Sequence, residues 1–297
     1  MEHKEGSFPL AVGYTLLSAT GMSLIGLFGK LGDQIFSLTA LIFWRFLSGF
    51  VLCFLLLWFM GMIRHQFWVK NIKMHLLRSL FVLVAQYSFY YYIQKETLLN
   101  GTMLLSTGPL FIPIIELVFM RRKVLRASWI ALGISFIGVI CILQPDRNIF
   151  SIYTAIGLLS GICQGASQVV FGMNVKEERS DLGVLYLMFF CAAISLGPYL
   201  IGESVERGEE GSFWPSFLLI FGLGAASIFN QIARATAYQH GAPSRLAVFL
   251  YFAVILAGFW DWIVFNILPN WLSVVGALLI ICGGILKLYY RVWFTGK

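Results

Sequence analysis

Apolar runs of about 20 residues recur along the whole chain, and they constrain its fold more than any other feature. A helix of about 20 residues crosses the roughly 30 Å hydrocarbon layer of a membrane, because each residue adds about 1.5 Å. Charged residues make up 12% of the 297 residues, whereas a soluble domain carries about 25%. We therefore expect an all-α, multi-pass integral membrane protein whose solvent is the lipid bilayer.

Breaks at charged, glycine-containing and proline-containing stretches divide the chain into ten candidate membrane-spanning helices. The start of the chain has mixed charge and lacks a short apolar core followed by a cleavage site, so we expect the first run to be kept as a span. The ten predicted helices cover residues 9–29, 37–60, 75–94, 98–119, 127–144, 153–174, 183–202, 214–235, 244–266 and 270–290.

Lysine and arginine are distributed unequally over the loops between these spans. Sixteen fall on one side of the membrane and four on the other, with Arg78 and Arg234 assigned to loops and Arg45 alone to the interior of a span. Because cytoplasmic loops carry the excess of basic residues, we expect both ends of the chain in the cytoplasm, in the inner membrane of a bacterium. The same bias accounts for the net charge of +7, so we expect no nucleic-acid partner.

The two halves of the chain are similar when one is shifted by about 145 residues. Gly21 corresponds to Gly165 at a shift of 144, and Glu116 corresponds to Asp261 at a shift of 145. Small residues at such spacings also serve close helix packing in membrane proteins generally. Packing does not explain why two membrane acids share one repeat position, so we favour an internal duplication.

Each predicted repeat, 1–148 and 149–297, holds five spans. Because five is an odd number, the second repeat enters the membrane upside down relative to the first. We therefore expect two inverted five-helix repeats, with both ends of the chain on the inner side. This architecture is typical of secondary transporters, which open a site at the repeat interface to each side in turn.

Several sequence features fit a known family. They are "WRF" around Arg45, "PLFIPIIELVF" in the fourth span and "PNWLSVVGALLIICGGIL" in the tenth. With these features the chain resembles the drug/metabolite transporter superfamily, specifically its EamA-type ten-helix carriers, over nearly its whole length. The resemblance implies a central cavity for amino acids, other small polar metabolites or drugs. The aromatic-rich ninth span is similar to that of the S-adenosylmethionine carriers of intracellular bacteria.

The chain departs from this family at one pair of positions. Many relatives carry a glutamate near the ends of the fourth and ninth spans, whereas this chain has Arg121 and Asn266 there. A role for that glutamate is therefore not carried over.

Arg45 lies in the middle of the second span, about 13 Å from its outer end. A cation at that depth costs at least about 2.5–3.5 kcal/mol unless it faces a partner or water, so we expect it to point into the protein. Two interpretations stay open. Arg45 binds a carboxylate or phosphate of the substrate, or it stabilises the fold by bonding to backbone carbonyl groups or to an acid.

Uncharged polar side chains also occur within the spans, where lipid provides no hydrogen-bond partner. With aromatic walls they suit a zwitterion or a ring-bearing metabolite, although any single one can instead serve a hydrogen bond between helices. The predicted substrate-binding residues besides Arg45 are Gln86, Tyr87, Tyr90, Gln164, Ser167, Gln168, Asn230 and Tyr251.

Two acids lie toward opposite mouths of the predicted carrier. Glu116 is near the inner end of the fourth span, and Asp261 is near the outer end of the ninth. Pro109 and Pro113 share the helical face of Glu116, and Gly258 lies beside Asp261, so these three are places where a helix can bend. We expect gating or coupling roles for all five. The alternative for Glu116 is an ion pair with the basic loop that follows it.

Other classes of function fit the sequence less well. The four histidines are scattered at loop or terminal positions, and the five cysteines lie in apolar runs without metal-ligand spacing. We therefore expect neither an enzyme nor a metal or cofactor site. The short loops argue against an interaction or assembly protein.

We predict a carrier of a small polar organic metabolite, such as an amino acid or S-adenosylmethionine. Export of hydrophobic or cationic drugs is the alternative, and a non-transport membrane protein is the less favoured one. The sequence leaves open the substrate, the direction, the coupling ion and whether identical chains form a homo-oligomer.

Overall fold

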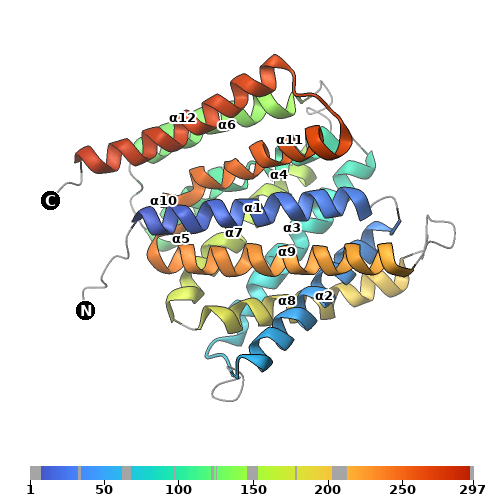
Figure 1. Cartoon of the computed structure of the whole chain (residues 1–297). Helices are drawn as coiled ribbons and strands as arrows, with labels where there is room; N and C mark the ends of the chain where they lie inside the picture. Colours follow the sequence, from blue (N-terminus) through green and yellow to red (C-terminus); the bar gives the residue numbers. More distant parts are fainter. Residues whose placement is uncertain are drawn as a thin grey trace.

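The computed structural model describes residues 8–32, 35–61, 68–95, 98–121, 124, 126–145, 153–177, 179–202 and 213–294. Every regular element in these ranges is helical, as the sequence predicted (Figure 1). The elements are α1 (Phe8–Gly32), α2 (Leu38–Phe59), α3 (Ile72–Lys95), α4 (Leu98–Leu105), α5 (Gly108–Met120), α6 (Arg126–Leu143), α7 (Thr154–Glu177), α8 (Ser180–Ile201), α9 (Phe213–His240), α10 (Pro243–Leu246), the 3₁₀ helix η2 (Ala247–Tyr251), α11 (Phe252–Phe265) and α12 (Trp271–Phe294).

Nine spans among the described residues are long and apolar enough to cross a membrane, judged by length and composition. They coincide with nine of the ten predicted spans, which confirms a multi-pass membrane protein. The one remaining predicted span, the third along the chain at 75–94, is also helical. It corresponds to α3, whose 24 residues extend about 36 Å but whose sequence is more polar than that of the nine.

The fourth predicted span, 98–119, is wrong in one respect, because the structure divides it into α4 and α5. The division falls at Ser106 and Thr107, immediately before Gly108 and Pro109. Proline has no N–H to donate to the carbonyl of Leu105, and its ring clashes with that turn. The helix therefore ends and restarts with Pro109 in the first turn of α5, where no N–H is needed.

The ninth predicted span, 244–266, is likewise not one α-helix. It consists of α10, the 3₁₀ helix η2 and α11. The tighter winding of η2 occurs where the chain packs against α1, α5, α6 and α12 together, and every residue of η2 except Leu250 is buried. Packing on several neighbours has overridden the uniform helical pattern of the sequence.

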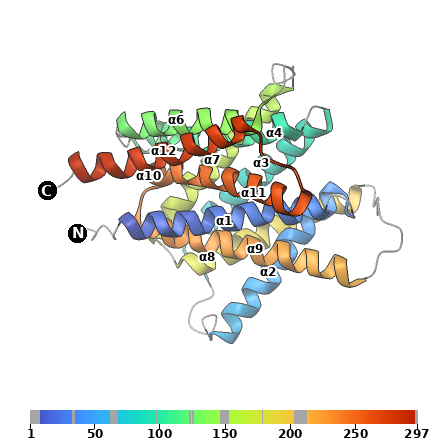
Figure 2. The same ribbon diagram turned by 45° about the horizontal axis from the view of Figure 1, so that its top comes forward.

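The halves of the chain pack against each other reciprocally. α1 lies along α9, and α7 lies along α3, so the first helix of each half packs on the third helix of the other. The second helices, α2 and α8, form a further pair, and so do the last helices, α6 and α12, which lie side by side in both views (Figures 1 and 2). The two ends of the chain emerge at the same end of the bundle.

Glycines allow the closest of these crossings. A Cβ on Gly138 of α6 would lie 2.5 Å from the carbonyl oxygen of Gly276 on α12, and a Cβ on Gly276 would lie 2.5 Å from that of Gly138. Neither backbone oxygen can move without shifting its helix. The α6–α12 pair therefore depends on both glycines.

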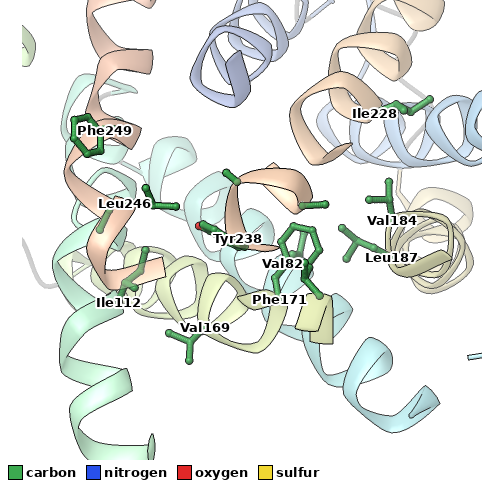
Figure 3. Packing of buried hydrophobic residues seen from close by; sticks show 14 of the residues in the cluster. Val82, Ile112, Val169, Phe171, Val184, Leu187, Ile228, Tyr238, Leu246 and Phe249 are labelled. Carbon is green, nitrogen blue, oxygen red and sulfur yellow. The ribbon is translucent and has the colours of Figure 1, made fainter. Parts of the chain in front are cut away.

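The hydrophobic core lies between the inner helices, and Figure 3 shows part of it. Phe171 of α7 meets Tyr238 of α9 edge to face, with 5.7 Å between the ring centroids. Ile112, Leu246 and Phe249 extend the core toward α5, α10 and η2. These contacts fix α9 in the middle of the bundle, where its polar residues face the helices around it.

Candidate functional site

A row of polar side chains follows one side of α9. Ser227, Asn230, Gln231 and Arg234 recur at spacings of three and four residues, which places them along one helical face. Asn230 is 2% exposed and Arg234 is 4% exposed. The side chains in this α9 row bond to α1, α2 or α3, so the row joins the two halves of the chain.

Arg45, on α2, contacts the start of the α9 row. Its Nε donates a hydrogen bond to Oγ of Ser227 at 3.1 Å, and the guanidinium carbon lies 5.2 Å from the ring centroid of Phe46. The side chain is half-buried and interacts electrostatically with Tyr90 of α3. Its partner among the described residues is a hydroxyl group and not an acid, so its charge stays uncompensated there.

Two residues of the α9 row donate hydrogen bonds to Ser18 of α1. Asn230 Nδ2 donates to the backbone carbonyl of Ser18 at 2.6 Å and to its Oγ at 3.2 Å. Arg234 Nε donates to the same Oγ at 2.9 Å. Ser18 is fully buried, so these bonds form away from solvent and hold Asn230 and Arg234 in fixed positions.

Arg78 of α3 meets the α9 row at Gln231. Its Nη2 donates to the side-chain oxygen of Gln231 at 2.8 Å, and its guanidinium carbon lies 3.3 Å from the ring centroid of Phe171. The residue is 1% exposed. Nε and Nη1 of Arg78 are buried without a hydrogen-bond partner among the described residues. Arg78 therefore combines a buried charge with unused donors.

Arg78 and Arg234 correct the sequence prediction, which assigned both to loops and did not include them in the site. The structure buries both inside helices, and His75, also expected at a loop position, is 1% exposed. The signal was present, because residues 78 and 234 both fall within predicted spans. The prediction missed this signal because it counted every cation near the end of a span as a loop residue.

Gln168 joins the interior from α7. Its side-chain oxygen accepts a hydrogen bond from the hydroxyl of Tyr238 at 3.1 Å, so it bonds to α9 one turn beyond Arg234. Ser167 is buried beside it at 1% exposure. Gln164 is half-buried and lies nearer to α5, where its Cγ would be 3.3 Å from a Cβ on Gly108.

Three further predicted residues lie on α3. Gln86 is 9% exposed, and Tyr87 and Tyr90 are half-buried. The hydroxyl of Tyr87 is buried without a partner among the described residues. Tyr90 is close enough to interact electrostatically with Tyr87 and also with Arg45. The structure thus brings these predicted aromatic residues to the α2 side of the interior.

Tyr251 lies apart from the α9 row. It is in η2, is 1% exposed and packs 6.3 Å from the ring of Phe136 on α6. Its hydroxyl has no partner among the residues that the structure describes. Among the described residues, no hydrogen bond or ring contact joins it to Arg45 or to the α9 row.

Glu116 is buried near the end of α5. One carboxylate oxygen accepts the hydroxyl of Ser244 at 2.6 Å, and the other accepts the backbone N–H of Ser244 at 3.2 Å. The residue is 1% exposed. Arg121 donates its backbone N–H to the carbonyl of Glu116, and no ion pair joins the two side chains in the described part of the chain. The other basic residues of that loop, Arg122 and Lys123, lie outside the described residues. Glu116 instead ties α5 to α10.

Asp261 lies at the other end of the bundle. Its carboxylate is 2.7 Å from Nζ of Lys30, the side chains being 43% and 41% exposed. The same Nζ lies 4.0 Å from the ring centroid of Phe265. This ion pair ties α11 to the last turn of α1.

The predicted bending positions occupy different surroundings. Pro109 opens α5 directly after the break, and Pro113 lies buried inside α5. Gly258 lies within the continuous helix α11, and a Cβ there would contact nothing within 4 Å. The irregular segment of the second half is η2 and not the turn that contains Gly258.

The described residues hold no group of three or more His, Cys, Asp or Glu side chains that could bind a metal ion. What they gather in the interior is a set of hydrogen-bond donors: three guanidinium groups, amides and hydroxyls. Guanidinium, amide and hydroxyl donors of this kind match the hydrogen-bond acceptors of polar or negatively charged groups.

Helices that cross a membrane, with guanidinium and amide groups gathered between them, define a polytopic membrane protein with a polar interior built from both halves. The chain belongs to the EamA-like transporter family, whose model matches residues 9–144 and again residues 151–289. This confirms the resemblance to the drug/metabolite transporter superfamily.

Characterised relatives are similar over most of their length but at low identity. The pseudopaline exporter CntI of Pseudomonas aeruginosa is 21% identical over 243 residues, which cover 81% of this chain and 82% of that protein. The riboflavin transporter of Vibrio cholerae is 24% identical, with 74% and 72% covered. The S-adenosylmethionine uptake transporter of Rickettsia bellii is 20% identical, with 95% and 94% covered.

One solved structure supports the fold. It matches with a TM-score of 0.77 at 14% sequence identity, and the match covers 95% of this chain and 98% of that chain. The helix arrangement is therefore one that occurs in a known protein.

Proposed function

We propose that this chain is a secondary transporter that moves a small polar organic metabolite across the bacterial inner membrane by alternating access. The observation that carries the proposal is the α9 row with its partners on α1, α2 and α3. Buried polar and charged groups are costly inside a membrane protein, and they mark the path of a polar solute. Here they lie between helices of both halves, where transporters built from repeats bind their substrates.

The two halves, 1–148 and 149–297, act in this proposal as inverted repeats. The family model matches each half separately, which supports the duplication. The ends of α5 and α11 give further support. Arg121 and Asn266 are 145 positions apart, both have left-handed backbones, and each donates its N–H to the carbonyl of Glu116 or Asp261 respectively.

Exchange of conformations between such repeats opens one end of the bundle while it closes the other. In this proposal the Glu116–Ser244 contact holds the end that carries both chain termini. The Lys30–Asp261 ion pair holds the opposite end. Arg45 and the α9 row lie between them and are the substrate site.

The names of the relatives support a polar organic substrate, since they concern pseudopaline, riboflavin and S-adenosylmethionine. The guanidinium groups of Arg45, Arg78 and Arg234 argue against the alternative of a cationic drug, because like charges repel in a medium of low dielectric constant. A transported metabolite of this class needs no cofactor and no catalytic step.

The experiment that tests transport is counterflow. Proteoliposomes are loaded with a mixed pool of unlabelled amino acids, nucleotides, organic acids, S-adenosylmethionine and quaternary ammonium drugs, and the uptake of each labelled solute is followed. We expect transient accumulation of at least one solute above the level in protein-free liposomes. Repeating the assay with a proton gradient then identifies coupling. Accumulation of quaternary ammonium drugs alone would replace the metabolite by the alternative substrate class.

The orientation is tested separately, with both ends of the chain placed in the cytoplasm. Single cysteines introduced in the loop 121–123, in a variant whose native cysteines are replaced, should resist an impermeant thiol reagent in intact cells. They should react after the cells are opened. Labelling in intact cells would show that the loop 121–123 faces the outside and that the predicted orientation is wrong.

A further inference from the structure

Three arginines in the middle of the bundle form a cluster without acids. We call Arg45, Arg78 and Arg234, from α2, α3 and α9, the arginine cluster. Their contacts on α9 lie at Ser227, Gln231 and Arg234 itself, which spreads them over about 10 Å along that helix. Arg234 also interacts electrostatically with both of the other guanidinium groups.

The hydrogen-bond partners of the arginine cluster are neutral. Arg45 bonds to Ser227, Arg78 to Gln231 and Arg234 to Ser18. The described carboxylates have other partners, since Glu116 binds Ser244, Asp181 binds Arg179 and Asp261 binds Lys30. None of the three arginines forms an ion pair with an acid in the described part of the chain.

Arg78 is the member of the arginine cluster whose buried hydrogen-bond donors lack acceptors. At 1% exposure it has two buried nitrogens, Nε and Nη1, without partners among the described residues. The ring of Phe171 covers one face of its guanidinium and so excludes water there. A buried cation that keeps free donors is costly unless a negative group completes its hydrogen bonds, and a planar guanidinium is suited to a carboxylate or a phosphate.

The scaffold itself does not require these charges. At the shift of 145, Arg45 corresponds to Phe190, Arg78 to Leu223 and Arg234 to Phe89. In each case the corresponding position of the opposite half holds an apolar side chain. The helical framework therefore does not require an arginine at these positions, which favours a role of the cluster in binding over a role in assembly.

We propose that the arginine cluster is the binding site of an organic anion, and that the transported metabolite carries a net negative charge. The proposal rests on the proposed transport function and narrows its substrate class. It excludes S-adenosylmethionine and cationic drugs, and it includes carboxylates and phosphate-bearing metabolites. Arg78 supplies the central hydrogen bonds, while Arg45 and Arg234 compensate further charge on the same molecule.

Binding is tested without transport, by thermal unfolding of the purified protein in detergent at constant ionic strength. The probes are citrate, glutarate and sulfate, with glutaramide as the uncharged counterpart of glutarate. We expect at least one anion to raise the unfolding temperature and glutaramide to leave it unchanged. Stabilisation by glutaramide that equals or exceeds the effect of every anion, or no stabilisation by any anion, would overturn the proposal.

Arg78→Gln should weaken the binding of the stabilising anion about 10- to 100-fold, because it removes charge-assisted hydrogen bonds. Arg126→Gln is the matched control, since Arg126 is exposed at the start of α6, and it should bind the anion as the wild type does. Equal binding by both variants would overturn the role of the cluster. If Arg78→Gln does not fold, Arg78→Lys keeps the charge and loses the planar donor set, and it should still weaken binding several-fold.

Counterflow separates this proposal from the proposed function. Uptake of a neutral or cationic solute only, unaffected by the anions, overturns the anion site and leaves transport intact. Stabilisation by an anion that Arg78→Gln abolishes, in a protein that moves no solute, supports the site and overturns transport.

Discussion

Glu116 and Asp261 lie at the same distance from the ends of α5 and α11, and their surroundings differ sharply. Each lies near the end of a helix whose last turn closes in the same way, with the N–H of a left-handed residue donated to the carbonyl of the acid. Yet the carboxylate of Glu116 is buried against Ser244, whereas that of Asp261 is 43% exposed beside Lys30.

This difference in burial shows that the local backbone geometry and the packing between helices are set separately. The helix ends alike because the local backbone geometry is the same at Arg121 and Asn266. The burial of each acid is set instead by the helix that packs over it, α10 for Glu116 and α1 for Asp261. One end of the bundle thus carries a buried hydrogen-bonded contact, and the other carries an exposed ion pair that costs little to break.

The largest expected effect comes from Glu116→Ala. The change leaves the N–H and hydroxyl of Ser244 buried without an acceptor, so we expect it to lower the free energy of unfolding by about 3 kcal/mol. Unfolding in detergent is followed with a thiol-reactive dye that reports the buried Cys53 and Cys191. Glu116→Gln keeps one acceptor and should lose less. If Glu116→Ala lowered the free energy of unfolding no more than Asp261→Ala does, the buried contact would not be the stronger of the two.

Ser244→Ala probes the same contact from the other side. It removes the 2.6 Å hydrogen bond but keeps the backbone N–H, so we expect a loss of about 1.5 kcal/mol. Combined with Glu116→Ala, its effect should be much smaller than the sum of the two single changes, because both remove one interaction. Strict additivity would mean that the two residues act independently.

Asp261→Asn should cost about 0.5 kcal/mol or less. The ion pair with Lys30 is exposed on both sides, where solvent screening and side-chain entropy offset most of the attraction. Lys30→Met should have a similarly small effect, and high salt should erase the difference between wild type and Asp261→Asn. A loss as large as that of Glu116→Ala would show that the two ends are equally closed.

The smallest effect concerns the two helix ends themselves. Arg121 and Asn266 have φ angles of 52° and 56°, a region that costs a long side chain more than it costs asparagine. Arg121→Gly should therefore raise the free energy of unfolding by about 0.5 kcal/mol, while Asn266→Gly should change it hardly at all. If the two substitutions changed the free energy of unfolding equally, the left-handed backbone would not cost Arg121 more than it costs Asn266.

The sequence predicted the positions of the apolar spans because lipid solvent imposes one length and one composition on every span. It did not predict that two spans are broken, although Pro109 marked one of the breaks. The η2 segment has no such local mark, because its winding depends on packing against four other elements.

The candidate site remains a prediction, but part of its geometry could be foreseen. Arg45 contacts the α9 row at Ser227, and Asn230 belongs to that row, as a cluster of polar residues within the spans suggested. Arg78 and Arg234 were missed, because a cation about two turns from a helix end can reach the surface or turn inward, and the sequence does not distinguish the two. Tyr251 was included although it packs on Phe136, since only the fold shows that η2 faces α6.

Alternating access is the central claim, and it is tested most directly by locking one end of the bundle. Lys30→Cys and Asp261→Cys are combined, bridged by a short reducible bifunctional thiol reagent and assayed by counterflow. The protein with Lys30→Cys alone, treated in the same way, is the control. We expect bridging to stop uptake and reduction to restore it. Unchanged uptake by the bridged protein would contradict alternating access, because the two ends would then not need to open in turn.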